Sequence, residues 1–127
     1  LLLDNDIAKA KDLQDVENIV LMEYDLEDGS TLPFPKSSFQ GVVVTNYLYR
    51  PIFPQLLNLL EDGGILIYET FAVGNEKYGR PTNPDYLLKS GELISLVSSQ
   101  MRIIAYEECL VRRPAKAYVQ RITAAKN

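Results

Sequence analysis

The chain has 127 residues, 46% of them hydrophobic and 24% charged, which is typical of a single soluble globular domain. Its formal net charge of −4 disfavours nonspecific binding to nucleic acid or an anionic membrane surface, and no apolar run approaches the ~20 residues of a membrane-spanning helix. The chain contains no histidine, which excludes Ser-His-Asp and Cys-His catalysis within it and disfavours a zinc site.

Two short strands are predicted near the start of the chain, and acidic residues follow each of them. Residues 1–3 are all leucine and predict the end of a buried strand, and residues 7–13 carry apolar side chains at helical spacing, with Asp6 suited to cap that helix. Residues 19–22 predict the second strand. Because the chain opens on Leu1 rather than methionine, we expect an amino-terminal piece to be missing, processed or disordered.

The centre of the chain predicts a strand, a helix and another strand. Residues 41–45 are apolar on both faces, as in a parallel strand that helices cover on both sides. Pro51 suits the first turn of the helix that follows, and a left-handed glycine of the Gly63-Gly64 pair is expected to close it before a fourth strand at residues 65–68. The predicted buried stripe of the helix is Ile52, Phe53, Leu56, Leu57, Leu59 and Leu60.

Residues 74–84 form a long irregular segment with two prolines and two glycines. A loop of this length is often functional, so both a substrate lid and an ordered connection are open interpretations. Residues 85–88 predict a single turn of helix. Ser90 is then expected to cap a helix over residues 92–98.

The chain ends in two predicted strands, residues 102–106 with a possible extension to Val111, and residues 117–122. The connection between them has the length of a hairpin, so the pair is expected to be antiparallel. Cys109 lies in an apolar run, which favours a core residue, and as the only cysteine it fits a reducing cytoplasm. The element order predicts an α/β fold with a mostly parallel sheet and an antiparallel carboxyl-terminal strand pair.

Polar and aromatic residues gather at the carboxyl ends of the third and fourth predicted strands. Open α/β sheets bind ligands at the carboxyl ends of their strands, so this edge is the predicted active site. Its residues are Asn46, Tyr47, Tyr49, Arg50, Glu69, Thr70 and Phe71.

Asp4 and Asp25 each follow a predicted strand and suggest a nucleotide site. A carboxylate at Asp4 can accept hydrogen bonds from both hydroxyls of a ribose, and one at Asp25 can accept from the exocyclic amine of adenine. The alternatives are a helix cap for Asp4 and a solvated acidic loop around Asp25. The chain has no glycine-rich phosphate-binding motif.

Several features occur in one order along residues 1–71: Asp4 after three leucines, Asp25-Leu26, Leu32-Pro33-Phe34, residues 39–46, and Leu60-Glu-Asp-Gly-Gly-Ile-Leu-Ile-Tyr-Glu. Together they resemble the class I S-adenosylmethionine-dependent methyltransferases, and the small type 11/12-like members most. The final strand pair is similar to the sixth and seventh strands of that family. Asp62 stands where the family's glycine step usually has proline.

The resemblance implies a Rossmann-like sheet and S-adenosylmethionine as the cofactor. Asp4 would hold the cofactor ribose, Asp25 with Leu26 the adenine, and Asn46 with Tyr47 would approach the methionine portion. The family's first strand and glycine-rich loop would precede the first residue, so the amino-terminal βα unit is expected to be missing.

Methyl transfer from a sulfonium needs in-line geometry and exclusion of water more than acid–base help. The ring faces of Tyr47, Tyr49 and Tyr68 could stabilise the cationic methyl group, with core packing as the alternative. Glu69 could orient or deprotonate the acceptor, or lie at a solvated strand end. Asn46-Tyr47-Leu48-Tyr49 differs from the family's Asn-Pro-Pro-Tyr signature, so amide or base N-methylation is not supported.

Four residues are candidates for substrate binding: Arg50, Phe71, Tyr78 and Arg80. Arg50 could pair with an anionic substrate, or with Glu76 or another surface acid. Tyr78 and Arg80 would act from the long loop if that loop is a lid.

The sequence thus predicts a methyltransferase for an unidentified, small-molecule acceptor, present in a form that lacks part of its cofactor pocket. The alternative is a non-catalytic module of the same fold that forms a homodimer or binds a partner through exposed strands. A nucleotide-dependent oxidoreductase on a related sheet is a third interpretation, which the antiparallel end and the Asp62-Gly63-Gly64 step disfavour.

Overall fold

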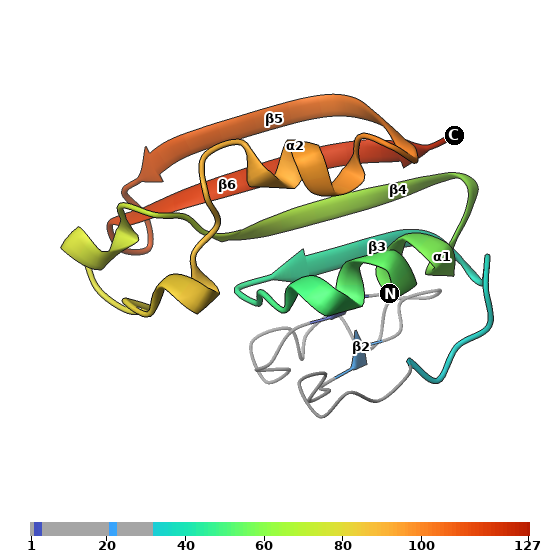
Figure 1. Ribbon diagram of the computed structural model, residues 1–127, viewed down its shortest axis with the longest axis horizontal. Coiled ribbons are helices and arrows are strands. Elements are labelled where there is room, and N and C mark those ends of the chain that lie inside the picture. Colours follow the sequence, from blue (N-terminus) through green and yellow to red (C-terminus); the bar gives the residue numbers. More distant parts are fainter. Residues whose placement is uncertain (1, 4–20, 23–31) are drawn as a thin grey trace.

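The computed structural model of the protein describes residues 2–3, 21–22 and 32–127. Its centre is one sheet in the order β2-β1-β3-β4-β6-β5 (Figure 1). The strands are β1 Leu2–Leu3, β2 Leu21–Met22, β3 Phe39–Thr45, β4 Leu60–Phe71, β5 Met101–Val111 and β6 Ala117–Lys126. Strands β1 to β4 are parallel, whereas β6 runs antiparallel to both β4 and β5. The predicted mixed sheet with an antiparallel carboxyl-terminal pair is confirmed.

Two short helices cover the same face of this sheet (Figure 1). A 3₁₀ turn at Arg50–Ile52 leads into α1, Phe53–Leu59, and α2 is Glu92–Val97. The face beneath them is the core, since alternate residues of the central strands are fully buried there. These core residues include Val42, Val44, Leu66, Tyr68, Ile122 and Ala124. The predicted stripe from Ile52 to Leu60 is buried in full.

The Gly63-Gly64 pair bends a strand, and the prediction that it closes a helix is wrong. Helix α1 ends at Leu59, and Leu60 is already extended and paired with Phe39. The register then moves two residues along β3 and five along β4, from Phe39↔Leu60 to Gly41↔Ile65. Gly63 has a φ of +80°, and a Cβ on Gly64 would lie 2.8 Å from the Glu61 carbonyl oxygen. Both glycines are therefore needed at this bulge.

A side chain of strand β6 caps helix α2, so the prediction that Ser90 caps it is also wrong. The N-cap residue is Gly91, in the left-handed conformation, and the Ser90 hydroxyl donates to Glu108 instead. The buried Gln120 of β6 accepts from the Leu93 N–H at 3.2 Å and donates to the Lys89 carbonyl oxygen at 2.6 Å. A tertiary contact thus satisfies the helix terminus.

The long loop is ordered by contacts at its base. Short 3₁₀ turns occur at Asn75–Lys77 and Pro84–Tyr86, the second in the region predicted as a helical turn. Val73 N–H donates to the Leu88 carbonyl oxygen at 2.9 Å, and Leu88 N–H donates to that of Phe71 at 3.0 Å. The loop therefore leaves β4 and returns beside its carboxyl end.

The described helices lack the length and apolar character needed to cross a membrane. The predicted helix over residues 7–13 and its cap at Asp6 lie outside the described residues. That an amino-terminal βα unit is missing stays a prediction.

Candidate functional site at the carboxyl edge of the sheet

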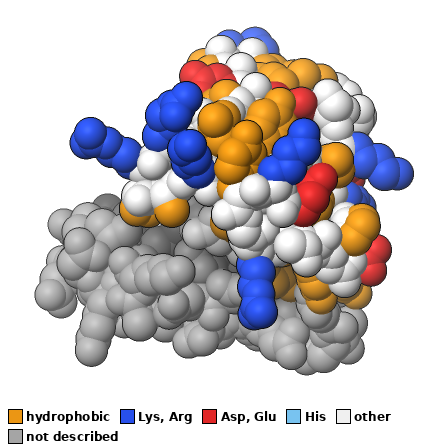
Figure 2. Space-filling view, turned by 90° about the vertical axis from the view of Figure 1, so that its left-hand side faces the viewer, with side chains coloured by type: hydrophobic (Ala, Val, Ile, Leu, Met, Phe, Trp, Pro, Cys, Tyr) orange, Lys and Arg blue, Asp and Glu red, His pale blue; other side chains and the backbone are white. Residues whose placement is uncertain are grey.

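The carboxyl ends of β3 and β4 meet because the two strands are parallel and in register. Thr45 pairs with Glu69, and the Asn46 N–H donates to the Glu69 carbonyl oxygen at 3.0 Å. Strand β3 ends there and β4 continues two residues further, to Phe71, so both carboxyl ends lie at the same edge of the sheet. Figure 2 shows this end of the molecule, where Lys and Arg side chains surround an exposed hydrophobic area.

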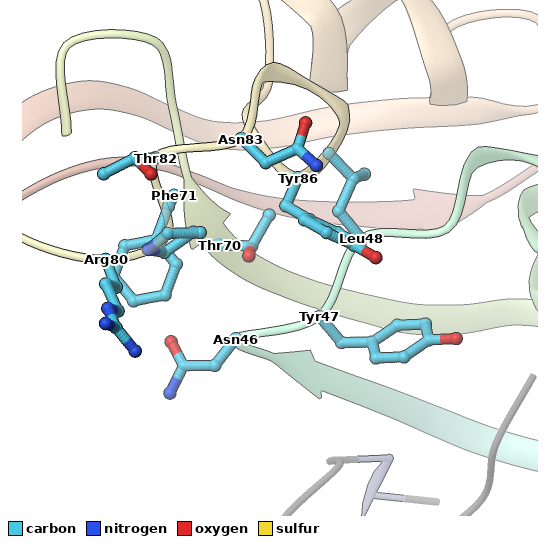
Figure 3. A pocket seen from close by; sticks show the side chains of 10 residues that line it. Asn46, Tyr47, Leu48, Thr70, Phe71, Arg80, Thr82, Asn83 and Tyr86 are labelled. Atoms are coloured by element: carbon cyan, nitrogen blue, oxygen red, sulfur yellow. The ribbon is translucent and has the colours of Figure 1, made fainter. Parts of the chain in front are cut away.

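A pocket of about 620 Å³ opens at this edge, and we call it the edge pocket (Figure 3). Its volume is within the range usual for small-molecule sites. Its walls come from the end of β3, the end of β4 and the far side of the long loop. They are formed by Asn46, Tyr47, Leu48, Thr70, Phe71, Arg80, Pro81, Thr82, Asn83 and Tyr86.

Asn46 turns the chain out of β3. Its φ is +54°, in the left-handed region, where asparagine is among the better tolerated residues that have a side chain. The side chain is exposed and reaches the mouth of the edge pocket, as does that of Arg80 (Figure 3). Thr70, by contrast, is only 1% exposed and lies at the back of the pocket.

Tyr68 fixes the turn that carries Tyr47. The Tyr68 ring is fully buried and stacks on Phe53 with the ring centroids 4.9 Å apart, and its hydroxyl donates to the Tyr47 carbonyl oxygen. Burial, the largest cause, and then the neighbouring Tyr47 hold the pKa of the Tyr68 hydroxyl far above its usual value, so it stays a proton donor. Its ring face packs in the core and does not line the edge pocket.

Tyr47 and Tyr49, the two predicted aromatic catalytic residues, take different positions. Tyr47 lines the edge pocket, and its ring points away from Asn46 in Figure 3. Tyr49 is half-buried, packs against the core and is absent from the pocket lining.

Arg50 holds the framework together. Its Nη2 donates to Glu92 at 2.9 Å and to the Leu87 carbonyl oxygen at 3.0 Å, its Nη1 donates to that of Asp85 at 3.0 Å, and its Nε pairs with the same Glu92 carboxylate. Four of its five N–H groups are engaged. Arg50 therefore pairs with an acid of the protein, which was the alternative to binding an anionic substrate. The partner is Glu92 rather than Glu76.

Asn75 closes the long loop from within. It is only 1% exposed, its Oδ1 accepts from the Tyr118 N–H at 3.0 Å, and its Nδ2 contacts the Pro81 carbonyl oxygen at 3.4 Å. These bonds tie the loop to β6, as expected of an ordered connection.

A second pocket of about 540 Å³ adjoins the first, and the two share Asn46, Phe71 and Arg80. We call it the cationic pocket. It contains Glu69 and Tyr78 of the predicted site, and its basic residues are Arg80, Arg113, Lys116 and Arg121. Glu69 is ion-paired with Arg121 at 3.1 Å, which positions its carboxylate on the sheet face.

The structure therefore brings together seven of the predicted site residues: Asn46, Tyr47, Glu69, Thr70, Phe71, Tyr78 and Arg80. Asp4, Asp25 and Leu26 lie outside the described residues. Sequence reasoning missed Leu48, Thr82 and Tyr86 in the edge pocket and the basic residues from the β5–β6 connection. The Arg112-Arg113 pair in the sequence indicates that this connection is basic.

Comparison with known proteins identifies the fold of this chain. No family model matches the chain, and no curated protein matches it. An S-adenosylmethionine dependent methyltransferase from Mesorhizobium loti is 16% identical, with a TM-score of 0.65 over 98% of this chain and 79% of that one. A SAM-dependent methyltransferase from Methanosarcina mazei is also 16% identical, with a TM-score of 0.58 over 84% of this chain.

The third structure is geranyl diphosphate C-methyltransferase from Streptomyces coelicolor A3(2), in complex with Mg²⁺, geranyl diphosphate and S-adenosyl-L-homocysteine. It is 14% identical, with a TM-score of 0.60 over 94% of this chain. The chain spans 66% of the Methanosarcina structure and 57% of the Streptomyces structure. The fold is accordingly that of the class I S-adenosylmethionine-dependent methyltransferases.

Proposed function

We propose that this chain binds S-adenosylmethionine at the carboxyl edge of its sheet and transfers the methyl group to a small-molecule acceptor. The observation that carries the proposal is a methyltransferase-type sheet with a ligand-sized pocket where β3 and β4 end. The three structural neighbours support it, since each is a methyltransferase and one holds S-adenosyl-L-homocysteine.

In this proposal, Asp4 accepts hydrogen bonds from the cofactor ribose, and Asp25 and Leu26 contact the adenine. Asn46 and Tyr47 approach the methionine portion from the end of β3. The left-handed conformation of Asn46 supports this role. Such positions usually hold glycine, but here a residue with a polar side chain lies at the pocket.

When bound, the cofactor supplies a methyl group on a positively charged sulfur. The chain's own residues orient the acceptor and exclude water, which is the main source of rate in such a displacement. Phe71 and Tyr86 form apolar walls of the edge pocket, and Tyr47 lines it near the end of β3. Glu69 orients the nucleophile of the acceptor or takes its proton.

Calorimetric titration with S-adenosylhomocysteine tests the cofactor assignment. Asp4→Ala should weaken binding by about 1.5–3 kcal/mol, roughly tenfold to a hundredfold in Kd, because a charge-assisted hydrogen bond is lost. Asp62→Ala is the matched control, since Asp62 is an exposed acid at the opposite end of β4 from the pocket. Equal affinities for the two variants would reject the ribose role of Asp4.

A non-catalytic module that self-associates is the second candidate, and one observation favours it. Strand β5 is the last strand of the sheet, eleven residues long, and Ile104 on it is 49% exposed. An open strand edge can pair with a second chain. A stable dimer in sedimentation, together with no response to S-adenosylhomocysteine, would favour this candidate over the enzyme.

A further inference from the structure

The cationic pocket has a charge opposite to that of the whole chain. Four basic residues and one acid, Glu69, line it, while the chain carries a formal net charge of −4. These basic residues come from the long loop, the β5–β6 connection and β6, which the fold brings to one end of the molecule. A concave site lined by one sign of charge concentrates the potential that attracts an oppositely charged ligand.

Three of these four basic residues have no partner among the described residues. Arg121 pairs with Glu69 at 3.1 Å and approaches Glu107 at 3.7 Å. For Arg80, Arg113 and Lys116, the described part of the chain provides neither an ion pair nor a side-chain hydrogen bond, and all three are exposed. These three like charges repel one another, and an anionic ligand would reduce that repulsion.

Apolar side chains also line the cationic pocket, beside polar ones such as Asn46 and Asn75. The apolar residues are Phe71, Val111, Ala117 and the buried Val119. A ligand that fits these walls therefore combines an apolar body with an anionic group. The volume of about 540 Å³ is that of a small-molecule site rather than a single ion.

The two pockets adjoin, and Asn46, Phe71 and Arg80 line both of them. A molecule with its anionic group near Arg113 and Lys116 would direct its other end toward Asn46 and Glu69. That is the side on which the proposed cofactor site begins.

We propose that the cationic pocket binds the anionic group of the methyl acceptor, so that the acceptor is a small, partly apolar carboxylate or phosphate ester. This inference rests on the proposed function. It gives Arg80, Arg113 and Lys116 the role of acceptor-binding residues, which is separate from any contact with the cofactor.

The test uses small probes and NMR titration of the ¹⁵N-labelled chain. Benzoate and phenyl phosphate carry the two candidate anionic groups, and benzamide is the uncharged control of the same shape. We expect one or both anions, but not benzamide, to shift the backbone amide signals of Arg113 and of residues 115–119. The anion that binds more tightly identifies the carboxylate or the phosphate source.

Variants then locate the site. Arg113→Gln combined with Lys116→Gln should weaken binding of the preferred anion about tenfold or more, whereas Arg102→Gln, an exposed arginine at the other end of β5, should not change it. Dispersed amide spectra of the variants show that they are folded. No shift with either anion, or equal loss in the control variant, would overturn the proposal.

S-adenosylhomocysteine titrated into the same samples separates the two proposals. Cofactor binding without anion binding would reject the cationic pocket and leave the methyltransferase proposal standing. Anion binding without cofactor binding would reject the acceptor role and the proposed function together. Tighter binding of the anion when S-adenosylhomocysteine is present would support both.

Discussion

Two groups of charged side chains near the carboxyl edge differ in how the protein uses them. Arg50, in the turn after β3, directs four N–H groups to Glu92 and to two backbone carbonyl oxygens. Arg80, Arg113 and Lys116, in the cationic pocket, have no such partners among the described residues. Charges that the protein satisfies itself build the framework, and those that it leaves unsatisfied remain available to a ligand. An arginine near a predicted site therefore cannot be assigned from its position alone.

The largest effect on stability should come from replacing Arg50. Arg50→Ala should lower the free energy of unfolding by about 2–4 kcal/mol, because Glu92, whose side chain is 15% exposed, loses its partner and two backbone carbonyl oxygens lose their donor. Urea unfolding followed by circular dichroism measures this. Arg112→Ala, at an exposed arginine without an ion pair among the described residues, is the control.

A smaller effect should appear at acidic pH. The Arg50 hydrogen bond, the largest cause, holds the pKa of Glu92 below its usual value of 4.5. A carboxyl group with a lowered pKa in the folded state contributes stability above its unfolded pKa and loses it as the pH falls through the folded pKa. The urea midpoint of the wild-type chain should thus fall more steeply below about pH 5 than that of Glu92→Gln.

Glu61→Gln is the control for the acid measurement, since Glu61 makes no ion pair among the described residues. It should follow the wild-type pH dependence. Parallel curves for wild type and Glu92→Gln would mean that the Arg50–Glu92 pair adds no pH-dependent stability, and the framework assignment would then lose its electrostatic support.

The smallest effect on stability should come from the cationic pocket. Arg113→Gln with Lys116→Gln removes two exposed charges that contact no acid of the described chain, so the urea midpoint should stay the same or rise slightly as repulsion falls. A clear loss of stability would show that these residues belong to the framework, and it would remove the contrast with Arg50.

The strands of the central sheet could be predicted because their signal is local. The apolar run in residues 41–45 predicted a strand there, and β3 occupies Phe39–Thr45, which begins two residues earlier. The candidate edge followed from the same pattern, since the residues after β3 and β4 must meet if the strands are parallel. Asn46, Glu69 and Phe71 were found in this way.

The errors arose where a local pattern fits two structures. A glycine pair after an apolar helix suits a helix end and a strand bulge equally well, and pairing with β3 selected the bulge. A serine before a helix suggests a cap, but Gln120, far along the chain on β6, supplies the bond to Leu93. Neither the bulge nor the helix cap can be predicted from the few residues that surround it in the sequence.

By itself, the sequence determined the class of the sheet and the edge at which its parallel strands end, because apolar periodicity acts over a few neighbouring residues. Only the tertiary structure decided which charged side chains form ion pairs and hydrogen bonds within the protein. Arg50 meets Glu92 across 42 positions, and Arg80 joins Arg113 and Lys116 at one pocket through the antiparallel return of β6. Contacts between segments so far apart depend on how the strands pack. The few residues that neighbour each contact in the sequence do not indicate that packing.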